Sequence, residues 1–390
     1  MIKKYFFRNQ DFICFSFNYD LNKQEISSLN KEADFSKCPI FLSNFEPSII
    51  QEYLEYERPT PLNRQGYENL FDKKFNPFSF YEIGLGLSML DNFWICDEKS
   101  LNLKWKDINL FDNFKNEIDN IFLLSNIQKE KIKVENKHIF SPDFMLPGEL
   151  RKSIKKEEDK FYLKKANSKF GSKIEYMQIY AEFFASQIAK QLELNAVYYD
   201  IENIEENLVN TCEWFIKKGE NFIPFSTLFI KGNDSKESLI KNLNIVFGKE
   251  NFQNLMLFDS IILNVDRHLG NFGIIVDSLT NSFISPAPIY DNGKSFLFDF
   301  NLYDKKSLKF SLENYGGRIV NLWPSFDQQM FENLDIRHKI WIDKLEDFEL
   351  KNHEDFPAPS KYFKACKKML KDQVEKLKNY YSVKFEKITE

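Results

Sequence analysis

The sequence predicts an α+β protein with a strand-rich N-terminal lobe and a mainly helical C-terminal lobe. Three observations support this fold class. The chain has 390 residues, which exceeds one minimal core and fits two lobes or two to three modules. Short apolar runs typical of strands are frequent up to residue 216. Longer segments with apolar residues at helical spacing dominate the second half of the chain.

The strands are predicted from short aromatic and β-branched runs bounded by turn residues. Aromatic runs at 5–7 and 12–17 predict a hairpin. Phe161, Leu163 and Lys165 share one face of a predicted strand at 161–166. A lysine on an apolar face is unusual, and the pattern alone favours a surface lysine whose aliphatic stem packs. The remaining strands are predicted at 196–201, 211–216, and in a hairpin of 273–276 and 282–285.

The helices are predicted from apolar residues that recur every three to four positions. The segment 175–194 is the clearest case, and Glu182 lies inside it as a candidate partner for a buried lysine. An apolar helix at 252–263 ends where a polar motif begins. Beyond residue 308 the chain reads as charged and helical, and 362–383 predicts an amphipathic C-terminal helix.

Composition limits the function classes. The net charge of −5 argues against a nucleic-acid binder that relies on a global positive field. The five cysteines form no CxxC pair, so neither a disulfide framework nor a zinc site is expected. No stretch approaches the length of apolar residues that crosses a bilayer. We therefore expect a cytoplasmic protein without a membrane partner and without direct nucleic-acid binding.

Two neighbouring motifs carry the chemistry. Residues 263–273, LNVDRHLGNFG, contain Asp266 and Asn271, and residues 285–295, SPAPIYDNGKS, contain Asp291. One carboxylate that orients a hydroxyl, plus an amide and a second carboxylate that hold metal ions, suits phosphoryl transfer from a Mg-nucleotide. Each motif alone is unspecific, but the predicted hairpin between them would return Asp291 to the side of Asn271.

Neighbouring residues of the first motif are expected to shape its loop. Gly270 and Gly273 are expected to permit the tight backbone that brings both side chains to one cavity. Arg267 is expected to stabilise the loop. A structural role for His268, bonded to backbone, is favoured over a catalytic one.

These motifs resemble the catalytic core of the HipA-like serine/threonine kinases, a branch of the protein-kinase-like fold. The resemblance implies that Asp266 is the catalytic aspartate and that Asn271 and Asp291 are the Mg²⁺ ligands. It places the nucleotide lysine, a second catalytic group, at Lys165, with Lys164 as the alternative if the register slips by one residue. It makes Glu182 the partner of that lysine.

The resemblance also covers the loop before the lysine strand and the chain as a whole. Residues 141–152 occupy the place of the family's phosphate loop, so the predicted nucleotide site comprises Gly148, Lys152, Lys165, Glu182, His268, Asn271 and Asp291. The implied domains are an N-terminal extension, 1–135, a kinase N-lobe, 136–220, and a helical C-lobe, 221–390. The extension is suggested mainly by residues 58–64.

The function implied by the resemblance is an ATP- and Mg²⁺-dependent serine/threonine protein kinase, with autophosphorylation. Two alternatives stay open: a kinase of a small molecule, and a pseudokinase of the toxin–antitoxin type that binds nucleotide and acts through a partner. Some members of the family pair with an antitoxin, so an antitoxin-like partner protein is possible. The regulatory serine of some members aligns near Met145, so that control does not carry over directly to this chain; Ser141 and Ser153 are conjectural substitutes.

Overall fold

The computed structural model describes the chain except residues 40–44, 59–60, 72–76, 116–119, 126–130, 134–137, 168, 171–173, 229–234, 303–321 and 387–390. The chain forms two compact units, and each is built from three segments. Unit 1 consists of Met1–Lys165, Trp214–Ile230 and Ile274–Ser285. Unit 2 consists of Ala166–Glu213, Lys231–Gly273 and Pro286–Glu390. This division into units does not test the predicted domain boundaries, so the domains 1–135, 136–220 and 221–390 stay predictions.

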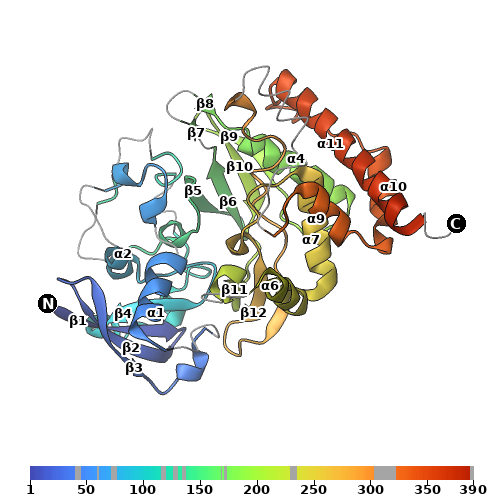
Figure 1. The fold of residues 1–390 in the computed structure, drawn as a ribbon. Coiled ribbons are helices and arrows are strands. Elements are labelled where there is room, and N and C mark those ends of the chain that lie inside the picture. The colour runs from blue at the N-terminus through green and yellow to red at the C-terminus, as the bar shows by residue number, and fades with distance from the viewer. Residues whose placement is uncertain are drawn as a thin grey trace. The chain divides into compact units, whose positions relative to one another are not determined.

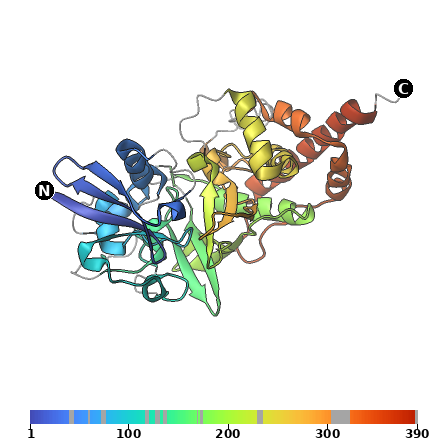
Figure 2. The ribbon, with the colours of Figure 1, turned by 90° about the horizontal axis from the view of Figure 1, so that it is seen from below.

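Unit 1 begins with a four-stranded antiparallel sheet in the order β3-β2-β1-β4. Figures 1 and 2 show its strands as the blue and cyan arrows near the N-terminus. The predicted aromatic hairpin is confirmed, because its two runs lie in β1 and β2 and pair Phe7 with Phe15. The strands are β1 Ile2–Asn9, β2 Phe12–Asp20, β3 Glu25–Lys31 and β4 Phe93–Asp97.

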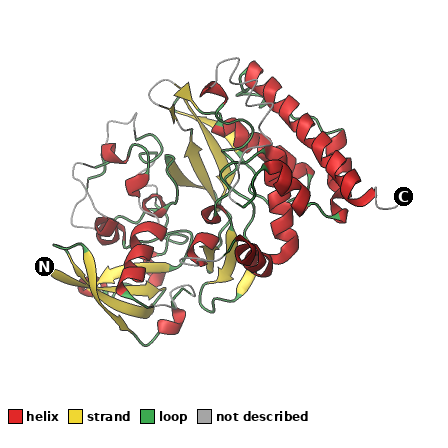
Figure 3. Ribbon diagram, in the orientation of Figure 1, coloured by secondary structure: helices red, strands yellow, loops and turns green. Residues whose placement is uncertain are grey.

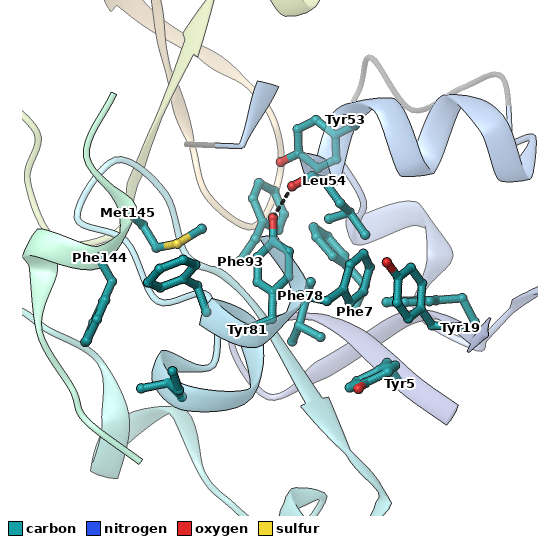
Figure 4. Packing of buried hydrophobic residues seen from close by; sticks show 14 of the residues in the cluster. Tyr5, Phe7, Tyr19, Tyr53, Leu54, Phe78, Tyr81, Phe93, Phe144 and Met145 are labelled. Atoms are coloured by element: carbon teal, nitrogen blue, oxygen red, sulfur yellow. Dashed lines mark hydrogen bonds between the residues drawn. The ribbon is translucent and has the colours of Figure 1, made fainter. Parts of the chain in front are cut away.

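Aromatic side chains build the core beneath this sheet. The rings of Phe7 and Phe15 stack with centroids 4.7 Å apart, and those of Tyr19 and Phe78 stack at 3.7 Å. Figure 4 shows this cluster, in which the Tyr81 hydroxyl donates a hydrogen bond to the carbonyl of Leu54. Many phenylalanines of unit 1 are therefore packing residues.

The rest of unit 1 contains short helices and two further groups of strands. Strands β5 and β6 form an antiparallel hairpin in which Lys152 lies opposite Lys165. Strands β11, β12 and β13 form a three-stranded sheet that includes the predicted hairpin after residue 273. The elements are α1 Pro47–Glu52, α2 Pro77–Gly84, α3 Trp105–Ile108, β5 Lys152–Glu157, β6 Lys160–Ala166, β11 Glu220–Pro224, α5 Phe225–Leu228, β12 Gly273–Asp277 and β13 Phe283–Pro286.

Unit 2 holds most of the long helices (Figure 3). Its strands are β7 Lys169–Phe170, β8 Ile174–Glu175, β9 Asp200–Ile204 and β10 Asn207–Glu213. Its helices are α4 Gln178–Gln191, α6 Lys236–Leu243, α7 Lys249–Ile262, α9 Phe326–Asn333, α10 Lys339–Glu346 and α11 Ser360–Tyr381. The helices predicted at 175–194, 252–263 and 362–383 are α4, α7 and α11. Of the helical region predicted from 308 onward, residues 308–321 lie outside the described residues.

Two predicted strand positions are wrong. The strand predicted at 196–201 starts at Asp200, and Ala196 makes only an isolated bridge to Ile289. The strand predicted at 211–216 runs over Asn207–Glu213. The hairpin between them turns at Glu205 and Glu206, both with positive φ, of 47° and 64°. Two glutamates carry no turn signature, since glycine, asparagine and aspartate normally supply this conformation.

Candidate functional site

The loop that carries Asp266 starts at the end of α7. Leu263 ends the helix in the left-handed conformation, φ 56°, and Asn264 N donates to Asp259 O at 3.0 Å. Asn264 Nδ2 donates to the Asp259 carboxylate at 3.3 Å, and Asn264 Oδ1 accepts from Asp266 N at 3.1 Å. These bonds fix the direction in which the chain leaves the helix, and hence the position of Asp266.

Arg267 is the centre of this loop. Its side chain is 4% exposed and donates Nε to Asp259 Oδ2 at 2.9 Å and Nη2 to Asp259 Oδ1 at 3.1 Å. Nη1 donates to the carbonyls of Asn271 and Tyr290, and Nη2 also donates to Asn292 Oδ1. One guanidinium thus joins both motifs, which confirms that they lie together and that Arg267 stabilises the loop.

The buried Asp259 and Arg267 side chains shift the pKa values of each other in opposition to burial. Burial opposes the charge on Arg267 and is the largest single influence, but the Asp259 carboxylate together with Asp291 and Tyr290 raises the pKa of the guanidinium overall. Burial likewise raises the pKa of Asp259, and the hydrogen bonds from Arg267 and Asn264 oppose that rise. A buried ion pair with all donors satisfied is costly to disrupt from one side, because the remaining charge loses its partner.

Asn271 is oriented by its own loop. Its Nδ2 donates to Asp266 O at 3.1 Å, so Oδ1 is the amide atom that remains to bind a cation. His268 Nδ1 accepts from Gly270 N at 3.1 Å and caps the short turn 269–271, as expected of a structural histidine. Gly270 and Gly273 do not have positive φ, whereas Leu263 and Asp291 do.

Asp291 has a left-handed backbone with φ 54°. Aspartate tolerates this conformation better than most residues, but it still signals a constrained position. The Tyr199 hydroxyl accepts from Asp291 N at 3.3 Å, and the Tyr290 hydroxyl donates to Gly270 O at 2.7 Å. Hydrogen bonds to two neighbouring segments therefore hold the main chain at Asp291, whose carboxylate is predicted to bind metal.

Glu182 is fully buried in α4 and belongs to the same assembly. Its Oε2 accepts from Asn292 N at 2.9 Å. A Cβ added to Gly293 would lie 3.3 Å from Glu182 Oε1, so the glycine of the second motif leaves room for the carboxylate. Glu182 therefore supports the loop of Asp291. Lys165 belongs to the other unit, and its predicted pairing with Glu182 stays a prediction.

The predicted nucleotide residues of unit 1 lie on the β5–β6 hairpin and the loop before it. Gly148 has φ +87°, and Lys152 Nζ donates to Pro147 O, so the lysine side chain closes over the glycine turn. Lys165 is 4% exposed, so the surface position that the strand pattern alone favours for it is wrong. Lys164 is also buried, and it forms an ion pair with Glu157 at 2.8 Å.

The loop 141–149 is held by Arg64, Ser153 and Ile154, to which the sequence gave no such role. Arg64, which is 3% exposed, donates to the carbonyls of Asp143 at 2.7 Å and Leu146 at 2.9 Å. The buried Asp143 carboxylate accepts from Ser153 Oγ and from Ile154 N at 2.8 Å. Burial raises the pKa of Asp143 to about 6. Residues 59–60 of the segment 58–64 lie outside the described residues.

Replacing Arg64 with methionine is expected to lower the free energy of unfolding by about 2 kcal/mol, because two buried carbonyls lose charged donors. Mg-ATP binding should weaken several-fold, since the loop loses its fixed conformation. Denaturant titration and calorimetry measure the two effects. The control is Lys23→Met, which removes an exposed ion pair to Glu25 and should change neither quantity. Wild-type affinity for Mg-ATP in Arg64→Met would contradict the ordering role.

The predicted residues of unit 2 supply only some of the ligands that a metal ion needs. Asn271 Oδ1 and the Asp291 carboxylate are oxygen ligands of the kind that Mg²⁺ prefers. Across the described part of the chain, no cluster of three or more His, Cys, Asp or Glu side chains could bind a metal by itself. A Mg²⁺ that is completed by nucleotide phosphates and water fits this set, whereas a structural metal does not.

Comparison with known proteins finds a family match over the region that contains most of the predicted site. The model of the HipA-like kinase family matches residues 154–311. That range contains Lys164, Lys165, Glu182 and the whole Asp266–Asp291 assembly, and it begins after Gly148 and Lys152. No curated protein matches the chain. The predicted resemblance to HipA-like kinases is confirmed over these residues.

The solved structures that are similar to the chain include a HipA complex and the kinase CtkA. One contains HipA and HipB of Shewanella oneidensis MR-1 with their operator DNA; the match has 12% identity and a TM-score of 0.54, and covers 96% of this chain and 97% of that one. The other is the Helicobacter pylori proinflammatory kinase CtkA, with 15% identity, a TM-score of 0.44, and coverage of 61% and 95%. The Shewanella match extends over nearly the full chain, and the predicted α+β kinase-like fold is confirmed.

The likeness to the Shewanella structure is one of fold. It gives no support to the prediction that this chain makes no direct contact with nucleic acid, since that structure includes operator DNA. Within the described residues, no helix is both long enough and apolar enough to cross a bilayer.

Proposed function

We propose that this chain is an ATP-dependent serine/threonine protein kinase that transfers the γ-phosphoryl group of Mg-ATP to a protein hydroxyl, including one of its own. The observation that carries the proposal is the Arg267-centred assembly. It joins the loop of Asp266 and Asn271 to the loop of Asp291 through buried hydrogen bonds. Rigid placement of charged groups supplies most of the catalysis in phosphoryl transfer.

The predicted residues other than His268, which caps the turn 269–271, have roles in this reaction. Asp266 aligns the attacking hydroxyl and accepts its proton. Asn271 and Asp291 would hold Mg²⁺, which offsets the charge that develops on the transferring phosphoryl group. Lys165, or Lys164 if the register differs, binds the nucleotide phosphates, and Glu182 supports the loop of Asp291. Gly148 and Lys152 shape the phosphate loop.

The test is an incubation of the purified chain with γ-labelled Mg-ATP, followed by separation of protein-bound label from small-molecule label. We expect label on serine or threonine of the protein and none after chelation of Mg²⁺ with EDTA. Label confined to small molecules would favour a small-molecule kinase. ATP binding without any labelled product would favour a pseudokinase, and either result would contradict the proposed reaction.

We further propose an antitoxin-like protein as a partner, because the fold matches that of a HipA whose structure contains HipB. Co-purification of the chain with the product of a neighbouring gene would support this partner. Binding of DNA by the isolated chain, measured by a mobility shift, would contradict the prediction that it makes no nucleic-acid contact.

A further inference from the structure

The Asp266 carboxylate has a cationic neighbour to which the sequence reasoning gave no role. Lys294 Nζ lies 3.0 Å from Asp266 Oδ2, and Lys294 follows Asp291 by three residues. Among the residues that the structure describes, neither charged group has another side-chain partner. A cation from the predicted metal loop therefore touches the predicted catalytic carboxylate.

The backbone around Lys294 is fixed to the catalytic loop. Val265 N donates to Lys294 O at 3.1 Å, and Phe296 N donates to Ile262 O at 3.0 Å. Phe296 and Leu297 are buried with positive φ, of 46° and 56°, so this segment has little freedom to shift. The Lys294 side chain itself is 42% exposed. A rigid backbone thus carries an accessible ammonium group beside Asp266.

Stability does not explain this ion pair. A solvent-exposed pair contributes about 0–1 kcal/mol to folding, because solvent screens the charges and two long side chains lose freedom. Unit 2 contains a comparable pair away from the motifs, Lys376–Asp327, at 2.8 Å and with side chains 37% and 34% exposed. The side chains of Lys294 and Asp266 are 42% and 35% exposed, so this pair differs from Lys376–Asp327 in its position and not in its burial.

We propose that Lys294 binds the γ-phosphoryl group of ATP while it holds Asp266, an inference that rests on the proposed function. A lysine ammonium has three donors, so it can bond Asp266 Oδ2 and a phosphoryl oxygen at once. The second carboxylate oxygen, Oδ1, is left to accept the substrate hydroxyl. Lys294 is then a catalytic residue that the metal-binding motif brings with it.

The charge of Lys294 acts where the reaction concentrates negative charge. The hydroxyl oxygen forms a bond to the γ-phosphorus, the bond from that phosphorus to the β–γ bridging oxygen breaks, the hydroxyl proton moves to Asp266, and ADP leaves. The equatorial oxygens carry the charge throughout, and a fixed cation near them stabilises the transition state.

The test compares Lys294→Met with the wild-type chain by phosphotransfer kinetics and by calorimetry with Mg-ADP and with Mg-AMPPNP, an analogue that keeps a γ-phosphoryl group. We expect kcat to fall about 10²-fold, as for loss of one preorganised donor. Affinity for Mg-AMPPNP should fall about tenfold, as for loss of one charge-assisted hydrogen bond, and affinity for Mg-ADP should not change. Lys294→Arg should recover part of both losses, since it keeps the charge.

The matched control is Lys376→Met, which removes an ion pair of similar length and exposure and should keep wild-type kinetics, affinities and Tm. Wild-type kinetics and binding in Lys294→Met would overturn the role of Lys294 and leave the kinase assignment intact. A third outcome is a wild-type chain that transfers no phosphate but binds Mg-AMPPNP more tightly than Mg-ADP, with Lys294→Met abolishing this preference. That outcome would support the contact between Lys294 and the γ-phosphoryl group and contradict the kinase assignment. Failure of the wild type to bind either nucleotide would overturn both.

Discussion

Asp266→Asn is expected to lower the rate of phosphotransfer about 10³-fold while the Kd for Mg-ATP changes less than about threefold. Asparagine has nearly the same shape and leaves the backbone bonds of the loop in place, but it cannot accept the hydroxyl proton. The bonds from Asp266 N to Asn264 and from Asn271 Nδ2 to Asp266 O do not involve the altered carboxylate. Single-turnover transfer of label and calorimetry measure the two quantities.

Two further variants test whether the loss of phosphotransfer in Asp266→Asn comes from the predicted site. Asp291→Ala removes a predicted Mg²⁺ ligand, so both phosphotransfer and the Mg²⁺ dependence of ATP binding should be lost. Asp327→Asn is the control, because Asp327 is 34% exposed and pairs with a lysine much as Asp266 does at 35%, but it lies on α9. Robust phosphotransfer by Asp291→Ala would contradict the assignment of the site.

Arg267→Met is expected to lower the free energy of unfolding by about 3–5 kcal/mol, because it leaves the buried Asp259 carboxylate without its cation. The same change removes the donors of the Asn271 and Tyr290 carbonyls, which hold the two motifs together. Phosphotransfer should therefore fall by more than unfolding explains at temperatures where the variant is still folded. Chemical denaturation and kinetics at low temperature separate the two effects.

Controls for Arg267 use the same substitution elsewhere and the removal of both charges. Arg337→Met removes a partly exposed ion pair with Asp335 and hydrogen bonds to the side chains of Gln253 and Asn254, and should cost clearly less than Arg267→Met because it leaves no buried charge without a partner. The double variant Asp259→Leu/Arg267→Met should recover part of the stability, since no unpaired charge remains, but none of the activity. A stable and active Arg267→Met chain would show that the assembly does not organise the site.

Local sequence was sufficient for some elements and not for others. The period of apolar residues located α4 and α7, because that pattern repeats over many residues, and two short aromatic runs around a polar turn located the first hairpin. The β9–β10 hairpin was misplaced, since its turn uses Glu205 and Glu206 at positive φ. Backbone angles of this kind are imposed by the strands on either side, and composition does not report them.

The same limit applied to the candidate site. Spacing in the two motifs was enough to select Asp266, Asn271 and Asp291 and to expect that Arg267 stabilises their loop. It did not select Arg64, whose partners Asp143 and Leu146 are about eighty residues away in the chain. It also did not locate the positive φ angles next to the motifs, which fall on Leu263 and Asp291. Long-range hydrogen bonds have no local signature.

The sequence by itself determined the fold class and the resemblance to HipA-like kinases, and it selected the candidate ligand residues, because these depend on residue type and spacing. Only the tertiary structure decided that one buried guanidinium joins both motifs, that Glu182 supports the loop of Asp291, and that Lys294 contacts Asp266. The reason is physical: burial and ionic contact depend on distances in space, and those are set when segments far apart in the chain pack together.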